Sequence, residues 1–426
     1  MSLLVLFASL LVQDPDVEDL LRKLETVAAE ARDRVIDAVV AKGEKAEPEV
    51  RRRLEGASES YKSRLNLVLR RFELQRKLKE LYPIPQPIDC DIRDKPVIEV
   101  IGDVEKWLGI PILRDKLPDA TVTLKLEGVS PLQALDAFHA ASGLTWRLEE
   151  DRRYDQERKI YIHELPQARL YPYQRSEWPA VISGRYRICA LSTNLERSDF
   201  AKGPSKFGQV SVALQYPMTC FPEGLASFSV ARIVDDKGRE LALIPDPPRH
   251  PFLRMNTGGG RPSLTGNFRF AHPAADARSI ALLGCRAKVE FVVERMYLTF
   301  ERPEESVGAT LECDGLKVKL KEFQPAFGWM RLILDQTGSL DISKVRVENY
   351  EFRGSSLLDR VEAVHEDGRI TYPNIQGAQS EEGVYRKRMM SFGTPKVKAI
   401  RLAVRSFMAY EEIEFDLRGI PLPGAK

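Results

Sequence analysis

The spacing of hydrophobic residues divides the chain into a helical first part and a β-rich second part. In residues 14–82 apolar side chains recur every three or four positions, which is the pattern of amphipathic helices. After Gly184 apolar and polar residues alternate between closely spaced turn signals, which is typical of antiparallel β domains. We therefore expect a multidomain α+β protein that ends in tandem antiparallel β-sandwiches at residues 184–302 and 303–426.

The helical part has recognisable ends within it. One helix is expected to end at Gly43, and another to begin near Pro48 and end near Gly56, because glycine terminates helices and proline is favoured in their first turn. Residues 17–81 loosely resemble HEAT-type helical hairpins through a set of apolar and small positions: Val35, Ile36, Ala38, Val39, Gly43, Ala46, Pro48 and Leu54. A solenoid needs about three repeats to bury a continuous core. The segment therefore either packs on its neighbour or is a plain helical hairpin.

The stretch from Ile88 to His163 contains two successive passes of strand, helix and strand. The helices are expected to begin at Pro96 and Pro131 and to end at Gly109 and Gly143, which are favoured residues for these positions. Each helix is flanked by short segments in which apolar and polar residues alternate. The pattern predicts a central α+β module of the type strand-helix-strand repeated twice.

The second pass carries a family resemblance. Val122 to Leu148, VTLKLEGVSPLQALDAFHAASGLTWRL, is similar to the short N-terminal domain shared by secretins and TonB-dependent receptors. The resemblance implies that residues 88–165 form a small module that docks protein partners in the periplasm and carries no catalytic residues. Secretins and these receptors continue into an outer-membrane barrel, for which this sequence gives no sign. Protein docking therefore carries over as an expectation, whereas secretion or transport does not.

Two segments around this module are expected to be linkers. Tyr82 to Pro87, with its three prolines, cannot continue a helix. Residues 166–183 are rich in proline and aromatic residues and form the second expected linker. Between the module and this linker, Ile160 and Ile162 are expected to pair back across a charged hairpin loop.

The β-rich part contains an internal repeat. Three segments find a counterpart later in the chain, in the same order: Lys206–Gln215 with Ala326–Asp335, Ala231–Ile244 with Val361–Asn374, and Ser279–Val289 with Ala399–Ala409. The second match places Gly238 and Gly368 at hairpin tips, where glycine supplies a positive φ. The repeat predicts duplicated β-sandwich domains.

Composition and the first residues bear on compartment and partner. Residues 1–13 contain an apolar run of signal-peptide length, too short to span a bilayer, and we expect a periplasmic or otherwise extracytoplasmic protein. The chain has 64 basic and 62 acidic residues. This balance gives no support to nucleic-acid binding. Two basic patches, at Arg51–Arg53 and at Arg70 and Arg71, are interpreted as solvated helix faces because acidic residues are interleaved with them. The five cysteines have no CxxC spacing, which disfavours a zinc site, although one disulfide in the β-rich part stays open.

Candidate chemical groups are scattered. His139, His163, His250, His272 and His365 form no HExxH motif or ligand-spaced pair, and no GxSxG motif is present. The glycine loop at residues 256–261 lacks the Lys-Ser/Thr of a P-loop. Acidic pairs at residues 304–305, 381–382 and 411–412 are expected in turns or at sheet edges. The sequence therefore nominates no catalytic residue, no cofactor and no metal ligand.

These features favour a non-enzymatic adaptor or structural protein that mediates protein-protein interaction in the cell envelope. The alternative is a carbohydrate- or polymer-binding β-sandwich protein with a cryptic hydrolase activity, using Tyr171, Tyr173, Trp178 and the loop at residues 246–267. A third interpretation is a detached part of a secretin or receptor signalling system. Neither the partner nor the oligomeric state follows from the sequence.

Overall fold

The computed structural model is mostly β, with helices at its N-terminal end and several antiparallel sheets. This confirms the expected order of a helical part, a mixed part and a β-rich part. The structure describes residues 16–114, 117–149, 152–155, 160–163, 167–172, 178–198, 205–217, 220, 222, 224–244, 263–313, 316–326, 329–337, 361–368, 370–371, 373–381, 384–392 and 396–423. The expected signal peptide at residues 1–13 lies outside these ranges.

The helical segment packs around its own core. Its elements are α1 (Val17–Thr26), α2 (Ala29–Ala41), the 3-10 turn η1 (Glu44–Ala46), α3 (Glu47–Leu54) and α4 (Glu59–Leu81). Gly43, at φ 75°, follows α2, and Pro48 lies in the first turn of α3, as the sequence predicted. The Tyr61 hydroxyl donates to the backbone carbonyl of Leu21 at 2.8 Å and joins α4 to α1. Among the described helices, none is long and apolar enough to cross a membrane.

The central module has its own core and two small sheets. Its elements are β1 (Ile88–Pro96), α5 (Val97–Leu108), β2 (Thr121–Val129), α6 (Pro131–Ser142), β3 (Leu144–Glu149), β4 (Arg152–Asp155), β5 (Ile160–His163) and β6 (Gln167–Pro172). Both helices end at the expected glycines, Gly109 and Gly143, in the left-handed conformation. Ser130 and Gln133 form a reciprocal capping box at the start of α6. These capping residues explain why the ends of both helices could be predicted from the sequence.

The strand pairing of the module differs from the prediction. β1 pairs antiparallel with β2, and β5 pairs with β4, whereas β3 pairs with β6. β6 lies within residues 166–183, which were expected to be a linker. Its Ala168 and Leu170 are buried in the module core, and the proline-rich surroundings hid this alternation. Ile112 belongs to no strand but forms an isolated parallel bridge with Ala168.

The first pair of sheets surrounds the largest core. Its strands are β7 (Ala180–Ser183), β8 (Tyr186–Ser198), β9 (Ser205–Gln215), β10 (Gly224–Asp235), β11 (Leu243–Ile244) and β12 (Ser263–Ala271), with parts of the long strands β13 (Ser279–Glu301) and β21 (Val397–Pro421). One sheet has the order β11-β12-β9-β8-β7, and β10 borders β13 in the facing sheet. Side chains from both sheets meet in one hydrophobic cluster. The arrangement is sandwich-like.

The second pair of sheets repeats this arrangement around a smaller core. Its strands are β14 (Thr310–Cys313), β15 (Leu316–Ala326), β16 (Trp329–Thr337), β17 (Val361–His365), β18 (Ile370–Thr371), β19 (Asn374–Glu381) and β20 (Val384–Phe392). The outer sheet has the order β14-β15-β16-β20-β19, and β17 borders β21 in the facing sheet. The expected hairpin tips are observed, with φ 78° at Gly238 and 83° at Gly368.

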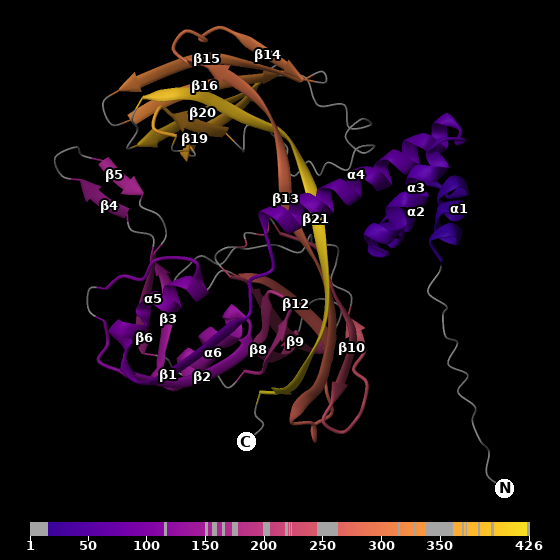
Figure 1. The fold of residues 1–426 in the computed structure, drawn as a ribbon, viewed down its shortest axis with the longest axis vertical. Helices are drawn as coiled ribbons and strands as arrows, with labels where there is room; N and C mark the ends of the chain where they lie inside the picture. Colours follow the sequence, from indigo (N-terminus) through magenta and orange to yellow (C-terminus); the bar gives the residue numbers. More distant parts are fainter. Residues whose placement is uncertain are drawn as a thin grey trace.

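β13 and β21 belong to both cores. They pair antiparallel along their length, from Ser279 opposite Pro421 to Glu301 opposite Ala399, and Figure 1 shows them running from one β lobe to the other. Residues of β21 from Ala409 to Ile420, and Leu422 just after it, contribute to the first core, although the sequence assigned them to the second domain. The expected boundary between residues 302 and 303 therefore does not separate the two cores. Pairing partners so far apart in the chain leave no local signal.

The register of these strands has an internal symmetry. A shift of 120 positions, which takes Ser279 to Ala399 in the matched segments, also takes Glu301 to Pro421. The pair Ser279 and Pro421 thus becomes the pair Ala399 and Glu301, which is observed. Glu290 is opposite Tyr410, and the shift of 120 positions takes Glu290 to Tyr410, so this pair is its own counterpart. The register of the two strands is therefore symmetric about this pair.

We predict that Leu417→Ala loosens the first core although residue 417 lies far beyond residue 302. Leu417 has 1% exposure, and such a truncation costs about 2–5 kcal/mol. Hydrogen exchange should accelerate in β8, β9 and β12, while the exposed neighbour substitution Arg418→Ala should leave it unchanged. Acceleration confined to residues 303–426 would contradict the shared-strand arrangement.

Candidate functional site

Helix α4 lies on the long strands between the two cores. It contacts both β13 and β21, and the crossing is visible in Figure 1. At its C-terminal end, Leu74 and Leu78 enter the first core. Further toward its N-terminus, Arg70 lies over the Phe407 ring, 4.7 Å from the ring centre. The helical segment is therefore held on the strands by apolar contacts, and a cleft lies beside this contact.

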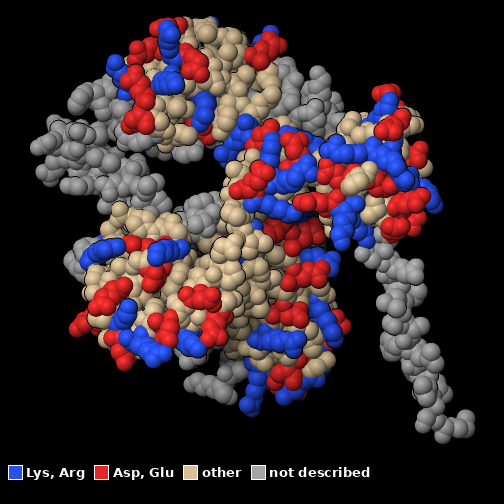
Figure 2. All heavy atoms as spheres, viewed as in Figure 1, with Lys and Arg blue, Asp and Glu red and all other residues tan. Residues whose placement is uncertain are grey.

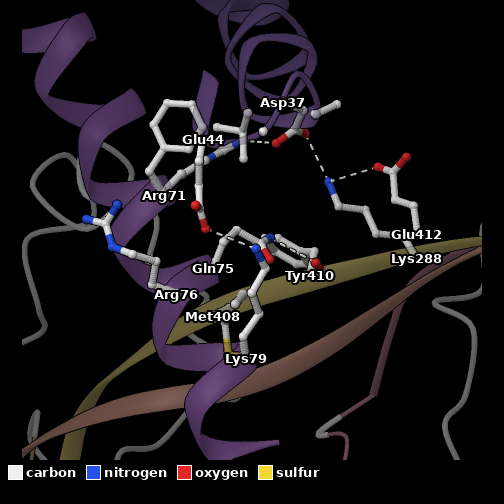
Figure 3. A pocket seen from close by; sticks show the side chains of 15 residues that line it. Asp37, Glu44, Arg71, Gln75, Arg76, Lys79, Lys288, Met408, Tyr410 and Glu412 are labelled. Carbon is white, nitrogen blue, oxygen red and sulfur yellow. Dashed lines mark hydrogen bonds and ion pairs between the residues drawn. The ribbon is translucent and has the colours of Figure 1, made fainter. Parts of the chain in front are cut away.

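The cleft lies between the helical segment and the long strands and has a volume of about 280 Å³. Figure 3 shows the side chains that line it. It is lined by Asp37, Val40, Ala41, Gly43, Glu44, Arg71, Phe72, Gln75, Arg76, Lys79, Lys288, Met408, Ala409, Tyr410 and Glu412. Met408 and Tyr410 lie next to the symmetry point of the strands, so the cleft borders the middle of β21.

Asp37 joins the helices to the strands through a chain of charges. Its carboxylate accepts hydrogen bonds from Arg71 of α4 and, at 2.9 Å, from the Lys288 ammonium of β13. Lys288 also lies 3.9 Å from Glu412 and 4.4 Å from the centre of the Tyr410 ring. Figure 3 shows these groups pointing toward one another across the cleft. We call Asp37, Arg71, Lys288 and Glu412 the latch.

Glu294 of β13 provides a second charged contact with α4. It accepts hydrogen bonds from Lys77 and from Arg70, the latter at 3.2 Å. The hydrogen bond from Lys77 lowers the pKa of Glu294, and the same bond raises the pKa of Lys77. Beside them, the Gln75 amide donates to the Tyr410 carbonyl at 2.8 Å. α4 is thus bound to both long strands by polar groups as well as by apolar ones.

The remaining charged groups at the cleft pair within the helical segment. Arg76 donates to Glu47 at 2.5 Å, and Lys79 donates to Glu44 at 3.1 Å. Figure 2 shows Lys and Arg interspersed with Asp and Glu over the visible face of this segment. Because each charged lining group has a partner of opposite sign, the cleft is suited to holding elements together. Within the described ranges, no group of three His, Cys, Asp or Glu side chains could hold a metal ion.

A second polar cluster lies at the edge of the first core. Arg185, with 6% exposure, donates to the Tyr82 carbonyl at 2.6 Å, and its Nε lies 3.2 Å from Glu411. Tyr186 donates to the same carboxylate at 2.6 Å. Burial and the nearby Glu411 charge raise the pKa of Tyr186. The cluster ties the Tyr82–Pro87 connection to β8 and β21.

The thiol and phenol beside this cluster are not activated. Burial raises the pKa of Cys220 to about 11 and that of Tyr216 to about 12. Both groups are therefore protonated at neutral pH, and Cys220 does not present the thiolate that a nucleophile requires. The five cysteines of the chain are all free. The cluster is suited to a structural role.

The structure keeps the predicted histidines apart. His139 is buried on α6, with its Nδ1 4.0 Å from Asp136. His365 is buried at the end of β17 and lies 2.8 Å from the Thr371 hydroxyl. His272 is 2.8 Å from the Pro273 carbonyl. His163 ends β5, and His250 lies outside the described residues.

The other candidate groups have mixed outcomes. Glu411 and Glu412 lie in β21 where it pairs with β13 on one side and with no other described strand, because β17 pairs only with its first part. The expected edge position is therefore observed, although both carboxylates also bind the partners named above. Glu304 and Glu305 lie in an exposed turn as expected. The glycine loop at 256–261, Tyr173 and residues 246–262 lie outside the described ranges.

The two remaining aromatic residues are partly covered. Tyr171 is half-buried, with the Arg147 guanidinium 5.3 Å from its ring centre. Trp178 is half-buried and packs against the first core. These positions do not favour a polymer-binding platform, which needs exposed rings. The latch and the Arg185 cluster were missed because their members are separated by up to several hundred positions. For the same reason the interpretation of Arg70 and Arg71 as a solvated face was wrong: Arg71 is buried, and Arg70 binds Glu294 of β13.

Comparison with known proteins gives no family. No family model and no curated protein matches the chain. A solved structure described as "The crystal structure of the conserved domain protein from Bacillus anthracis" covers 56% of this chain and 89% of its own length, at 9% identity and a TM-score of 0.17. A likeness at that TM-score does not establish a common fold.

We predict that Asp37 and Lys288 are energetically coupled. Asp37→Asn should lower the free energy of unfolding by about 1–2 kcal/mol, because it leaves Arg71 and Lys288 partly buried without their shared carboxylate. Lys288→Met should have an effect that is not additive with it in a double-mutant cycle. Asp19→Asn, on the exposed face of α1, is the matched control. Additive effects of Asp37→Asn and Lys288→Met would contradict the latch.

The contact of Glu294 with α4 should depend on pH. Because the pKa of Glu294 is lower in the folded protein, its stabilisation is complete above the ordinary glutamate pKa of about 4.3 and is lost as pH falls through the folded value. Lys77 behaves oppositely: its pKa is raised, so its contribution is lost only as pH rises through the folded value, above about 10.4. Glu294→Gln should flatten the acid limb of a stability-pH curve. An unchanged acid limb would contradict this assignment.

Proposed function

We propose that the chain is a non-enzymatic extracytoplasmic adaptor or structural protein that mediates protein-protein interaction in the cell envelope. The observation that carries the proposal is the latch, in which charged groups of the helical segment are paired with groups on the two strands shared by both β cores. Such pairing fixes separate lobes relative to one another. A fixed multi-lobed scaffold is suited to presenting surfaces to partners.

The central module supports a docking role. Val122–Leu148, which resembles the short N-terminal domain of secretins and TonB-dependent receptors, forms β2, α6 and β3 around one core. On α5 the apolar side chain of Ile98 has 52% exposure, and exposed apolar residues of this kind are available to a partner. We infer that residues 88–165 dock a protein partner, and that residues 17–81 are HEAT-like hairpins that pack on their neighbour.

We also propose that the β-rich part consists of two copies of one β-sandwich. The support is the matching strand order of the two outer sheets and the symmetric register of β13 and β21. Duplication explains why each copy contributes one long strand to the other. It also makes the two outer sheets directly comparable, position by position.

The adaptor proposal predicts an extracytoplasmic protein in a complex. Fractionation of the producing cells should recover the chain outside the cytoplasm, in a species larger than its 48.3 kDa. A photo-crosslinking residue at Ile98 should capture a partner protein, whereas one at Val307, exposed at 47% on the second β lobe, serves as the control. A free monomeric chain recovered from the cytoplasm would refute the proposal.

A further inference from the structure

The outer face of the sheet β14-β15-β16-β20-β19 carries an excess of positive charge. Leu320, Leu332 and Met389 point into the second core, and the alternate positions of the same strands point away from it. Among the side chains that the structure describes in these strands, the outward charged residues are six cations and three carboxylates: Lys317, Lys319, Lys321, Arg331, Arg386 and Arg388, with Glu312, Glu322 and Asp335. We call this surface the basic face.

The three carboxylates are used within the face. Arg386 donates to both oxygens of Asp335, at 2.6 and 2.9 Å. Glu312 lies 3.3 Å from Lys317, and Glu322 lies 3.6 Å from Arg331. The other three cations, which are exposed, have no ion pair with any described residue: Lys319, Lys321 and Arg388.

Protection of a sheet edge does not explain all of these cations. Arg388 lies on β20, which β19 flanks, and Lys319 lies in the part of β15 that pairs with β14, whereas Lys321 lies beyond that pairing. Lysines that prevent aggregation lie on edge strands. A hydrogen bond from Arg386 lowers the pKa of Asp335, and the charges of Lys321 and Lys319 lower it further. The described cations nevertheless outnumber the carboxylates on this face, and the surplus positive charge calls for a role.

The matching face of the first sheet shows what such a surface binds. Gln215 and Asp335 are equivalent in the internal repeat. Their neighbours across the strands are Arg187 and Lys319 respectively. Arg187 donates to the Asp136 carboxylate of α6 at 2.7 Å, so a helix presents an acidic side chain to this row of the first sheet. In the second sheet the equivalent Lys319 is exposed.

We propose that the basic face docks an acidic segment of a protein partner, which presents carboxylates to Lys319, Lys321 and Arg388 as α6 presents Asp136 to Arg187. This inference rests on the proposed adaptor function and names the chemistry of one partner surface. A nucleic acid fits less well, because a backbone with a phosphate at every nucleotide would also place negative charges near Asp335 and Glu322, whereas a protein segment can place acidic residues opposite the cations and uncharged or donor groups opposite these two carboxylates.

Fluorescence anisotropy of a labelled peptide of alternating Glu and Ala, titrated with the full chain at low and high salt, tests the proposal. Charge reversal at Lys319, Lys321 and Arg388 should weaken peptide binding about tenfold or more, and high salt should weaken wild-type binding. A matched control reverses three exposed cations elsewhere: Lys23, Lys45 and Lys398. It should bind within about twofold of wild type. A further variant with Gln at all three face positions removes the charges without reversing them. Its thermal unfolding shows whether the protein is still folded, so that weaker peptide binding can be assigned to the missing charges.

Three results would overturn the basic face as a protein-docking site. One is no binding of the peptide at low salt, and another is equal loss of binding in the control and the face variant. The third is a face-dependent binding of single-stranded RNA or of phosphatidylglycerol vesicles that exceeds peptide binding. None of these depends on where the chain resides or on whether Ile98 captures a partner, so the adaptor proposal fails or stands by its own experiment.

Discussion

The pairing of β13 with β21 is the constraint on which the rest of the structure depends. Each strand leaves one core and enters the other, so neither core is complete without a segment that is distant in sequence. The backbone hydrogen bonds of the ladder fix the register, and a slip by one residue would turn every inward side chain of both cores to the opposite face. Both cores therefore select the same register.

The middle of the two strands needs a further support. Around the symmetry pair of Glu290 and Tyr410 the strands pass from one core to the other, and there α4 packs against them. Apolar residues at the C-terminal end of the helix join the first core, while Asp37 and Glu294 hold its charged groups. Ion pairs between partly buried groups resist displacement because separation leaves charges poorly solvated. The helical segment thereby becomes part of the β scaffold, which agrees with the expectation that so short a helical stub packs on its neighbour.

The sequence predicted what depends on neighbours along the chain. Ser130, Gln133 and Gly143 define the ends of α6 by local hydrogen bonds and by a left-handed glycine, and the structure has these features. The internal repeat could be detected in the sequence because the matched strands have similar residues. The sequence could not show that β13 and β21 are shared by both cores, because apolar and polar residues alternate along β21 in the same way whichever core the strand faces. Glu411 illustrates the difficulty, since its role is set by Arg185, in the turn before β8, and by Tyr186 of β8, which are far away in the chain.

The proposed duplication also gives a reason for the difference between the two outer sheets. Where Asp136 of α6 meets the first sheet, the row contains neutral Gln215 and buried Ser263 beside Arg187, and Asp136 supplies the carboxylate partner of the arginine. A covered face must pair its charges, because an unpaired buried charge costs several kcal/mol. The equivalent row of the second sheet contains Lys319, Asp335 and Arg386. Exposure alone permits charges there but favours neither sign. An excess of one sign among the described side chains of this face is instead what a surface complementary to an acidic partner requires.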